Sequence, residues 1–368
     1  MGALVVAGAG MAGLVAAARA RELGAEAVVY EKGGRAGGSM LLSSGVVWRH
    51  RSLGEFHEEC PGGDLALQRL VLDGLDEALD WLEELGAPIV ERETGNPRTV
   101  GRRFETRGLT DALVRAAGDV RLREPFREAH VLATGGFAAR LARERGLLLR
   151  ANRWSEGDGL AYALTRGADL SSGMDEFYGR NLPGEVSEER YVGASQLYGA
   201  HALVLDEEGR EFFEGEPSWS ETDLVQATAR LPGGAAWYVL DARALRQETR
   251  YGSVADLVER ARELGGEVRP AEELPFALPE HPKLAEPPFL AVRVRAAVTH
   301  TIGGLRVDER ARVLRPDGEP VGGLWAAGAD AGGIFTGGYG SGLAAALVLG
   351  RAAAESAVEE LDLVAQCH

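Results

Sequence analysis

Cysteine is scarce in this chain of 368 residues, which contains only Cys60 and Cys367. Two cysteines so far apart form neither a disulfide framework nor the close spacing of a metal site, and they fit a reducing, cytoplasmic environment. No run of about 18 apolar residues occurs, so we expect no membrane-spanning helix and no membrane partner. The first residues, MGALVVAGAGMAGL, lack a basic leader and are interrupted by glycine, so we expect no signal peptide.

Positive charge is in the minority, because 40 Lys and Arg residues accompany 56 Asp and Glu residues, a formal net charge of −16. Nonspecific nucleic-acid binding depends on a basic surface, so this charge excludes it. Six of the seven histidines show no metal-ligand spacing: His50, His57, His130, His201, His281 and His368. What remains is a globular protein, 45% apolar and 26% charged, with enough residues for one large domain or two smaller ones.

Glycine, by contrast, is abundant, and the 50 glycines lie in clusters rather than at a fixed period. The first cluster belongs to ALVVAGAGMAGLVAAARARELGAEAVVYEK, which predicts a complete β–α–β unit. A short apolar strand over Ala3–Ala7 is followed by the spacing G-x-G-x-x-G, a helix over Leu14–Leu23 and a second strand over Ala27–Tyr30. Glu31 closes the second strand. The combination predicts a dinucleotide-binding unit.

Each of these positions has a physical reason in a dinucleotide site. Gly8 allows the tight turn, Gly10 lets the backbone approach a pyrophosphate, and Gly13 lets the helix pack on the strand. The free N–H groups at the helix N-terminus favour the phosphates. Glu31 stands about 20 residues into the unit, where a carboxylate binds ribose hydroxyls and disfavours the 2′-phosphate of NADP. A second Gly/Ser-rich loop, EKGGRAGGSMLLSSG, follows directly and suits a longer, extended cofactor.

Four stretches, in order along the chain, carry a resemblance to a known group of enzymes. They are VVAGAGMAGL…VVYEK with GGSMLLSSG, then VLATGGF (Val131–Phe137), then THTIGGL within Val298–Leu305, and GLWAAGADAGGIFTGGYGSGLAAALVLGR (Gly323–Arg351). Together they resemble the FAD-dependent fumarate reductase and succinate dehydrogenase flavoprotein superfamily, which includes 3-ketosteroid Δ1-dehydrogenases. The resemblance implies that the cofactor is FAD.

The resemblance also implies an α/β fold, in which a discontinuous Rossmann-like FAD-binding domain carries an inserted α+β cap domain. The FAD-binding domain is expected to take residues 1–176 and 299–368, and the cap, which contacts the substrate, residues 177–298. An alanine-rich helix that begins near Ser341 is expected to point its N-terminus at the pyrimidine end of the flavin. A helix N-terminus carries about half a positive charge, which favours the negative charge of a reduced flavin.

The predicted cofactor-binding residues lie in five segments. They are Gly8, Gly10, Met11, Ala12 and Gly13; Glu31 and Lys32; Gly37, Gly38, Ser39, Ser43, Ser44 and Gly45; Ala133, Thr134, Gly135 and Gly136; and Gly328, Asp330, Ser341, Gly342 and Leu343. No histidine stands at the position where succinate dehydrogenases link FAD covalently. We therefore expect FAD to bind non-covalently.

The chain departs from the family pattern in several places. Only DVRLREPFREAH, residues 119–130, fills the space of the β-hairpin that usually precedes the ATGG strand, which leaves the adenine contact made there unaccounted for. The cap is shorter than is common. Ala329 replaces the usual acid after AAG, although Asp330 follows at once. FTGGYGSG stands where fumarate reductases carry an arginine, which disfavours a dicarboxylate substrate.

Family chemistry transfers a hydride between flavin N5 and a carbon beside a carbonyl or carboxylate, while a side chain moves the matching proton. His300 matches the histidine that binds the substrate's carbonyl or carboxylate in fumarate reductases; the alternative is a histidine that only forms a turn. Tyr178 and Arg180 fall on positions of polar substrate contacts, the tyrosine as an acid and the arginine as a carboxylate clamp. Packing within the cap and a surface ion pair are the alternatives for these two.

Two further candidates have weaker motifs. Tyr339 lies in the flavin loop, where a ring covers the isoalloxazine or donates a proton, as a tyrosine does in steroid dehydrogenases. Arg243 and Arg246 lie near the arginine that serves as acid in fumarate reductases, and a solvated helix face is the alternative. The acidic run EGEPSWSETD (residues 214–223) predicts a solvated cap loop.

The sequence as a whole predicts an FAD-dependent oxidoreductase that acts on a CH–CH bond of a small-molecule substrate. Since no haem motif or iron–sulfur ligand set occurs, the electron donor or acceptor is expected to be a separate molecule. Two alternatives stay open at this point. One is another flavin oxidase class, such as an amine oxidase or a carotenoid desaturase. The other is a trimmed FAD-binding protein with lost or altered catalysis.

Overall fold

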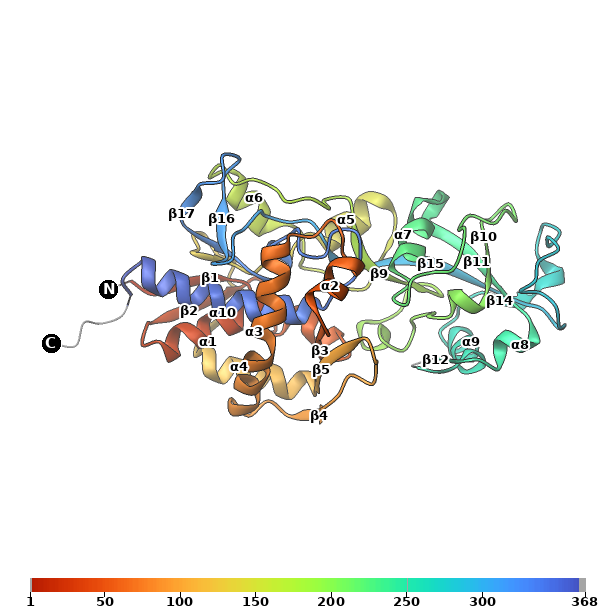
Figure 1. Ribbon diagram of the computed structural model, residues 1–368, viewed down its shortest axis with the longest axis horizontal. Coiled ribbons are helices and arrows are strands. Elements are labelled where there is room, and N and C mark those ends of the chain that lie inside the picture. Colours follow the sequence, from red (N-terminus) through yellow and green to blue (C-terminus); the bar gives the residue numbers. More distant parts are fainter. Residues whose placement is uncertain (1, 250, 364–368) are drawn as a thin grey trace. The chain divides into compact units, whose positions relative to one another are not determined.

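The computed structural model describes residues 2–249 and 251–363 and divides into two compact units (Figure 1). The first unit contains residues up to Arg140, Asn152–Phe177 and the chain from His300 onward. The second contains Leu141–Ala151 and Tyr178–Thr299. The short segment Leu141–Ala151, predicted to be part of the FAD-binding domain, therefore belongs to the second unit. Cys367 and His368 lie outside the described residues.

A six-stranded sheet forms the centre of the first unit, in the order β16-β17-β7-β1-β2-β6. Its strands are β1 (Leu4–Ala7), β2 (Ala27–Glu31), β6 (Asp119–Leu122), β7 (Val131–Leu132), β16 (Arg312–Leu314) and β17 (Pro320–Ala326). The five strands from β17 to β6 are parallel, and β16 pairs antiparallel with β17 at the edge. Such parallel strands are covered on both faces, which explains the unbroken apolar run of β1.

Two helices pack against each other beside this sheet, α1 (Met11–Glu22) and α10 (Gly342–Glu360) (Figure 1). Helix α1 connects β1 to β2, as the predicted β–α–β unit requires, but it begins at Met11 and not at Leu14. The third glycine of the motif therefore lies inside the helix. A Cβ atom on Gly350 would come within 2.7 Å of the Ala12 carbonyl oxygen, so α10 approaches the first turn of α1 as closely as a glycine permits.

A smaller antiparallel sheet, in the order β3-β5-β4, completes the β-structure of the first unit. Its strands are β3 (Val46–His50), β4 (Ile89–Glu91) and β5 (Thr99–Phe104). The other helices here are α2 (Leu53–Glu59), α3 (Leu65–Glu84), α4 (Thr106–Ala117) and α6 (Asp158–Leu164), with the short 3₁₀ helices η1 (Gly38–Leu42) and η6 (Gly328–Asp330). Helix α5 (Ala138–Arg145) runs from the first unit into the second.

The second unit is built on a sheet in the order β10-β11-β15-β14, with β8 and β9 also paired to β15. Its strands are β8 (Leu148–Leu149), β9 (Phe177–Leu182), β10 (Leu203–Leu205), β11 (Ala235–Leu240), β14 (Val268–Pro270) and β15 (Leu290–Thr301), with the separate pair β12 (Glu248–Thr249) and β13 (Gly252–Ser253). Its helices are α7 (Thr222–Arg230), α8 (Ala242–Leu245), α9 (Val254–Glu263), and the 3₁₀ turns η2 (Glu188–Arg190), η3 (Gly199–His201), η4 (Pro232–Gly234) and η5 (Ala271–Glu273). Apolar side chains of β11, β15, α7 and α9 form its core.

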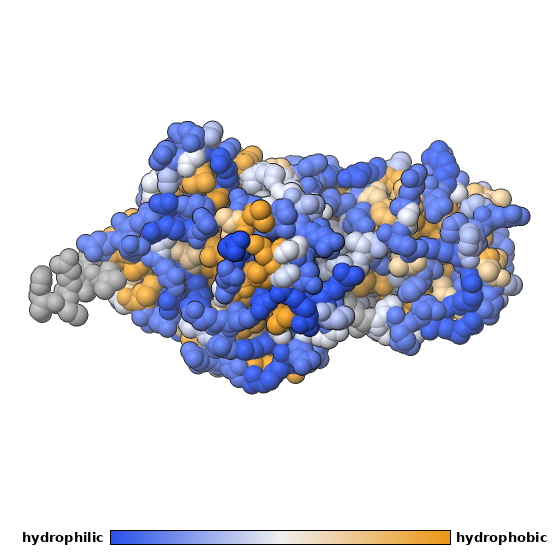
Figure 2. Space-filling model, in the orientation of Figure 1, coloured by the Kyte–Doolittle hydropathy of each residue, from blue (hydrophilic) through white to orange (hydrophobic). Residues whose placement is uncertain are grey.

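Hydrophilic residues cover most of the face seen in Figure 2. Among residues 2–249 and 251–363, no helix combines the length and the apolar character that crossing a bilayer requires. The same described residues contain no group of three or more His, Cys, Asp or Glu side chains arranged to hold a metal ion. Cys60 is buried, and burial raises the pKa of its thiol well above the usual range.

Candidate cofactor and active site

The first glycine loop connects β1 to α1. Gly8 has a φ of +102°, and a Cβ atom there would lie 2.2 Å from the Ala133 carbonyl oxygen, so both conformation and space require glycine. A Cβ atom on Gly13 would lie 1.9 Å from the carbonyl oxygen of Gly8. Gly10 differs, because its φ of −81° suits any residue and a Cβ atom would meet nothing within 4 Å. Its lack of a side chain keeps open the space in front of the α1 N-terminus.

Glu31 ends β2 beside this loop, and its carboxylate is largely buried. One oxygen accepts the N–H of Ala9 at 3.0 Å and the other accepts the N–H of Gly33 at 2.6 Å. An ionised carboxylate has about four acceptor sites, so each oxygen still has capacity for a ribose hydroxyl. The two backbone bonds fix the carboxylate at the end of the strand.

The second glycine loop lies directly against the first. The N–H of Gly37, whose φ is +101°, donates to the Ala9 carbonyl at 2.7 Å. A Cβ atom on Gly38 would be 3.3 Å from the Cα atom of Gly10. Ser39 Oγ accepts the N–H of Asn152 at 3.0 Å, which brings a third segment to the same place. The two glycine loops and the Asn152 segment therefore lie together, and we call this group the cradle.

The rest of this loop returns the chain to the small sheet. Ser43 Oγ donates to the Met40 carbonyl and accepts the N–H of Gly45, and the Gly45 carbonyl accepts the N–H of Phe104. The carbonyl of Ser44 accepts a bond from Arg103 Nε at 3.3 Å. The side chain of Ser43 thus shapes the turn into β3.

Asp330 is a buried carboxylate close to the ends of strands β7 and β17. Its carboxylate accepts the backbone N–H and the hydroxyl of Thr134, together with the N–H of Gly136 at 3.2 Å. Burial raises the pKa of Asp330 to about 6, although these donors act in the opposite direction. Asp330, a predicted cofactor residue, therefore also has a structural role, because its carboxylate holds the Thr134–Gly136 turn. Gly135 and Gly136 have φ values of +91° and +66°, and Gly328 one of +66°.

Lys32 forms an ion pair with Asp158, the first residue of α6. The pair is partly exposed, and Lys32 also lies 5.9 Å from the centre of the Trp154 ring. The predicted cofactor residue Lys32 thus connects the end of β2 to the segment before α6. Asp158 and Trp154 are not among the cofactor residues predicted from the sequence.

Helix α10 begins as predicted, with Ser341 as its N-cap. Ser341 Oγ accepts the N–H of Ala344 at 3.3 Å and that of Trp48 at 3.4 Å, so the cap also attaches β3 to the helix. The N–H groups of the first turn and the helix dipole make this end favourable for negative charge. Gly342 and Leu343, the predicted cofactor residues, form that first turn.

His300 lies at the end of β15 and against this helix terminus. A Cβ atom on Gly342 would be 3.4 Å from ring atoms of His300, and the Phe335 ring centre is 6.3 Å from the imidazole centre. The side chain is half-buried, and burial lowers the pKa of His300 to about 4. A helix N-terminus disfavours an imidazolium further. His300 is consequently a neutral imidazole at pH 7, able to donate one hydrogen bond.

Tyr339 is buried in an aromatic group beside the same helix end. Its ring centre lies 5.3 Å from that of Trp48, and its carbonyl contacts His50 Nε2 at 3.3 Å. Burial lowers the pKa of His50, so this histidine is neutral as well. Tyr339 is therefore placed near the α10 N-terminus, and both its roles, covering the flavin ring and donating a proton, stay predictions.

Tyr178 and Arg180 lie on β9 in the second unit. Arg180 is 1% exposed, its guanidinium lies 4.7 Å from the centre of the Tyr178 ring, and it donates to the carbonyls of Gly179 and Ser220. The alternative of a surface ion pair is wrong for Arg180, because the side chain is buried. Its role as a substrate clamp stays a prediction.

Glu221, a neighbour of Arg180, was not expected to be a buried group. The acidic run is exposed at Glu214–Glu216 and at Asp223, whereas Ser220–Thr222 are buried, so only part of the predicted segment is solvated. Burial raises the pKa of Glu221 to about 7, while the charge of Arg180 and N–H groups of Gly199 and Ala200 lower it. Nothing in the local sequence separates Glu221 from its exposed neighbours.

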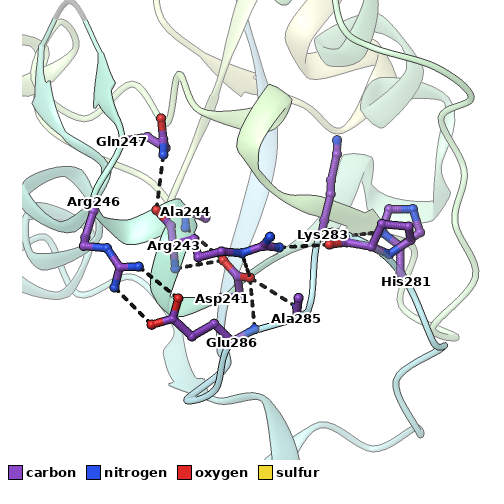
Figure 3. Close-up of polar contacts among 10 residues, drawn as sticks. Asp241, Arg243, Ala244, Arg246, Gln247, His281, Lys283, Ala285 and Glu286 are labelled. Atoms are coloured by element: carbon purple, nitrogen blue, oxygen red, sulfur yellow. Dashed lines mark hydrogen bonds and ion pairs between the residues drawn. The ribbon is translucent and has the colours of Figure 1, made fainter.

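Arg246 occupies a different kind of environment (Figure 3). Its guanidinium forms two hydrogen bonds with Glu286, at 3.2 and 2.9 Å, and its side chain is 62% exposed. Arg243 pairs with Asp241, the N-cap of α8, at 2.7 Å. The structure therefore agrees with a solvated helix face, the alternative reading of these two arginines.

The sheet, the two glycine loops and Glu31 define a dinucleotide-binding unit of the Rossmann type, and the residues present fit FAD. The decisive observation concerns Gly10. Neither its backbone conformation nor its packing requires glycine, and the absence of a side chain leaves open space before α1. A known family, the FAD-binding domain, matches residues 3–127 and 114–343. The chain belongs to this family, so the predicted family and cofactor are confirmed.

The relatives include a probable fumarate reductase of Shewanella frigidimarina (strain NCIMB 400), 23% identical over 97% of this chain and 74% of that protein. An NADH:fumarate oxidoreductase of Klebsiella pneumoniae (strain 342) is 24% identical over 91% of this chain and 45% of its own length. Among solved structures, a 3-ketosteroid-Δ4-(5α)-dehydrogenase from Rhodococcus jostii RHA1 superposes with a TM-score of 0.71 at 19% identity, over 96% of both chains. A flavocytochrome c3 fumarate reductase in its open conformation superposes with a TM-score of 0.68 at 21% identity, covering 97% of this chain and 78% of that one. These structures share the fold of this chain.

Proposed function

We propose that the protein is an FAD-dependent oxidoreductase that acts on a CH–CH bond, or the corresponding C=C bond, beside a carbonyl or carboxylate. Bound FAD supplies the hydride-transfer chemistry. The observation that carries the proposal is the contact between His300 and the N-terminus of α10, because it joins a hydrogen-bond donor to a site for negative charge. The names of the relatives, fumarate reductases and ketosteroid dehydrogenases, support this reaction class.

His300 has the properties needed to polarise a substrate carbonyl. Hydride transfer to or from the neighbouring carbon places partial negative charge on that oxygen, and a fixed hydrogen-bond donor stabilises it. A neutral imidazole donates through one ring nitrogen without giving up its proton, because its conjugate base is far too basic to form. The lowered pKa of His300 therefore supports a role as donor and positioning group rather than as a cationic acid.

The N-terminus of α10 supports the same chemistry from the cofactor side. Its first-turn N–H groups and its dipole stabilise an adjacent anion by about 0.3–2 kcal/mol. Ser341 holds that terminus by capping it and by accepting the N–H of Trp48. We infer that this end of the helix favours the reduced, negatively charged form of the flavin.

The remaining parts of the proposal concern binding and partners. FAD is held non-covalently through the loops at Gly10 and Gly38, a small molecule is the substrate, and a separate molecule donates or accepts electrons. Tyr178 and Arg180 stay candidates for polar substrate contacts from the cap. A cytoplasmic location stays a prediction from the cysteine content.

The test is anaerobic spectroscopy of the purified, FAD-loaded protein. We expect enones or enoates to reoxidise the reduced flavin, or saturated ketones to reduce the oxidised flavin. The variant His300→Ala should keep FAD bound and lose at least about 100-fold in turnover, the usual cost of removing one oxyanion donor. Loss of FAD from this variant would instead show that His300 is structural.

An FAD-binding protein with lost or altered catalysis is the second candidate. It is favoured by the burial of Arg180, whose guanidinium bonds to backbone carbonyls. A protein that binds FAD but whose flavin responds to none of the enones, enoates, saturated ketones or steroids would support this second candidate.

A further inference from the structure

Trp154 is a large aromatic side chain in an unexpected position. It is 42% exposed, although indole side chains are usually well buried. A Cβ atom on Gly33 would lie 3.0 Å from both Cδ1 and Nε1 of the indole and 2.9 Å from a carboxylate oxygen of Glu31. The indole therefore lies directly beside the carboxylate that ends β2, and part of its surface remains open.

The local structure holds the ring in this place. The N–H of Trp154 donates to Asn152 Oδ1 at 3.3 Å, and the N–H of Asn152 donates to Ser39 in the second glycine loop. Lys32 and Arg153 lie 5.9 and 5.7 Å from the ring centre. Two cations thus lie within 6 Å of the indole centre, and Asn152 links the Trp154 backbone to the second glycine loop.

Strand β6 forms the edge of the sheet next to β2, and it is followed by a segment of described residues without further strands. Strand β6 ends at Leu122, and among the described residues no further strand occurs before β7 begins at Val131. Arg123, with a φ of +60°, turns the chain there, and its N–H donates to the Gly33 carbonyl at 2.9 Å. In place of a hairpin, the side chains next to Gly33 and Gly34 after Glu31 are those of Trp154 and Arg123.

We propose that the indole of Trp154 stacks on the adenine ring of FAD and takes the place of the missing hairpin. The inference rests on the proposed binding of FAD in this cradle. In this proposal Glu31 accepts hydrogen bonds from the ribose hydroxyls, and the adenine is attached to the same ribose by one glycosidic bond. A planar ring beside the Glu31 carboxylate is therefore placed to contact the adenine. Base–aromatic stacking is effective for any nucleobase, and nearby cations strengthen the interaction.

The test compares three ligands on apoprotein: FAD, ADP, which keeps the adenosine end, and FMN, which lacks it. Trp154→Ala should weaken FAD and ADP binding by roughly 5- to 100-fold, the range that stacking on one base provides, and leave FMN binding unchanged. Trp154→Phe should retain most of the ADP affinity. Leu164→Ala is the matched control, because Leu164 is an equally exposed apolar residue on α6.

Fluorescence provides a readout that does not depend on turnover. The chain has six tryptophans, so the ADP-induced quenching of wild-type emission is compared with that of Trp154→Phe, and the difference is expected to carry most of the signal. Unchanged ADP affinity in Trp154→Ala would overturn the inference while leaving FAD binding intact. Equal weakening of ADP and FMN would show that Trp154 only supports the fold. A wild-type protein that binds neither FAD nor ADP would overturn the proposed function and the inference together.

Discussion

The imidazole of His300 lies against Gly342, the first residue of helix α10, at a distance where one added methyl group is in van der Waals contact. Strand β15 and helix α10 come from segments separated by about 40 residues, yet they bring a neutral hydrogen-bond donor to a helix N-terminus. A methyl group fits at position 342, whereas a larger side chain there would meet the ring of His300.

The effect of substitutions at Gly342 on turnover should depend on the size of the new side chain. In Gly342→Ala the new Cβ atom meets the His300 ring at 3.4 Å, so we expect turnover close to that of the wild type. In Gly342→Val the branched side chain displaces the imidazole, and a displacement of about 1 Å costs on the order of 100-fold in turnover. Steady-state kinetics with flavin content as a control measures both. Equal activity of the two variants would contradict the importance of this contact.

The pH dependence of His300 follows from its lowered pKa. Between about pH 4 and 6.5 the unfolded chain binds a proton at His300 that the folded protein does not, so the free energy of unfolding falls as the pH falls through this window. Above pH 6.5 the effect is absent. His300→Gln removes it, so the stability difference between wild type and variant should change between pH 6.5 and 4.5 and stay constant between pH 7 and 8. Denaturant unfolding at each pH measures this, and parallel profiles over the whole range would contradict the assignment.

Two glycines of the first loop should respond in opposite ways to alanine. Gly13→Ala places a Cβ atom 1.9 Å from the Gly8 carbonyl oxygen, so we expect a loss of unfolding free energy of about 1–3 kcal/mol or more. Gly10→Ala meets no protein atom within 4 Å and keeps an ordinary φ, so its stability should match the wild type. Its methyl group instead blocks the approach of a pyrophosphate, and FAD affinity should fall. Thermal unfolding and FAD titration of both variants provide the comparison. Normal FAD binding by a folded Gly10→Ala would contradict the prediction that the pyrophosphate approaches Gly10.

Arg246 should be dispensable. Its ion pair with Glu286 is exposed on both sides, so Arg246→Ala is expected to change the free energy of unfolding by less than about 1 kcal/mol and to leave turnover unchanged. Glu286→Ala serves as the matched control, because it breaks the same pair from the other side. A large loss of turnover in Arg246→Ala alone would restore the arginine as a catalytic candidate.

Much of the cofactor site is readable in the sequence because it depends on local backbone geometry. The spacing of Gly8, Gly10 and Gly13 and the acid at the end of β2 follow from a β–α–β unit, and Ser341 is a recognisable N-cap. The start of α1 was predicted three residues too late, because the motif glycines interrupt the apolar pattern although Gly13 is helical. Local sequence defines the elements and leaves their exact ends open.

Features that depend on long-range packing were not readable in the same way. Arg180 looks like an ordinary polar residue between a glycine and an asparagine, and only the folded second unit buries it beside Glu221. The segment Asn152–Trp154 reaches the cradle because Asn152 bonds to Ser39, 113 residues earlier in the chain. The sequence contains no periodicity that links two such segments.

The close approach of α10 to α1 at Gly350 also sets a distance. Along α10, Gly342 and Gly350 are eight residues apart, about 12 Å at the rise of an α-helix. Gly350 faces the first turn of α1 beside the first glycine loop, and Gly342, at the start of α10, faces His300. The helix thus sets the distance between the first turn of α1 and the imidazole of His300. A bulkier residue at position 350 would push α10 away from the first turn of α1, and it would thereby shift the N-terminus of α10 at Gly342 without contacting His300.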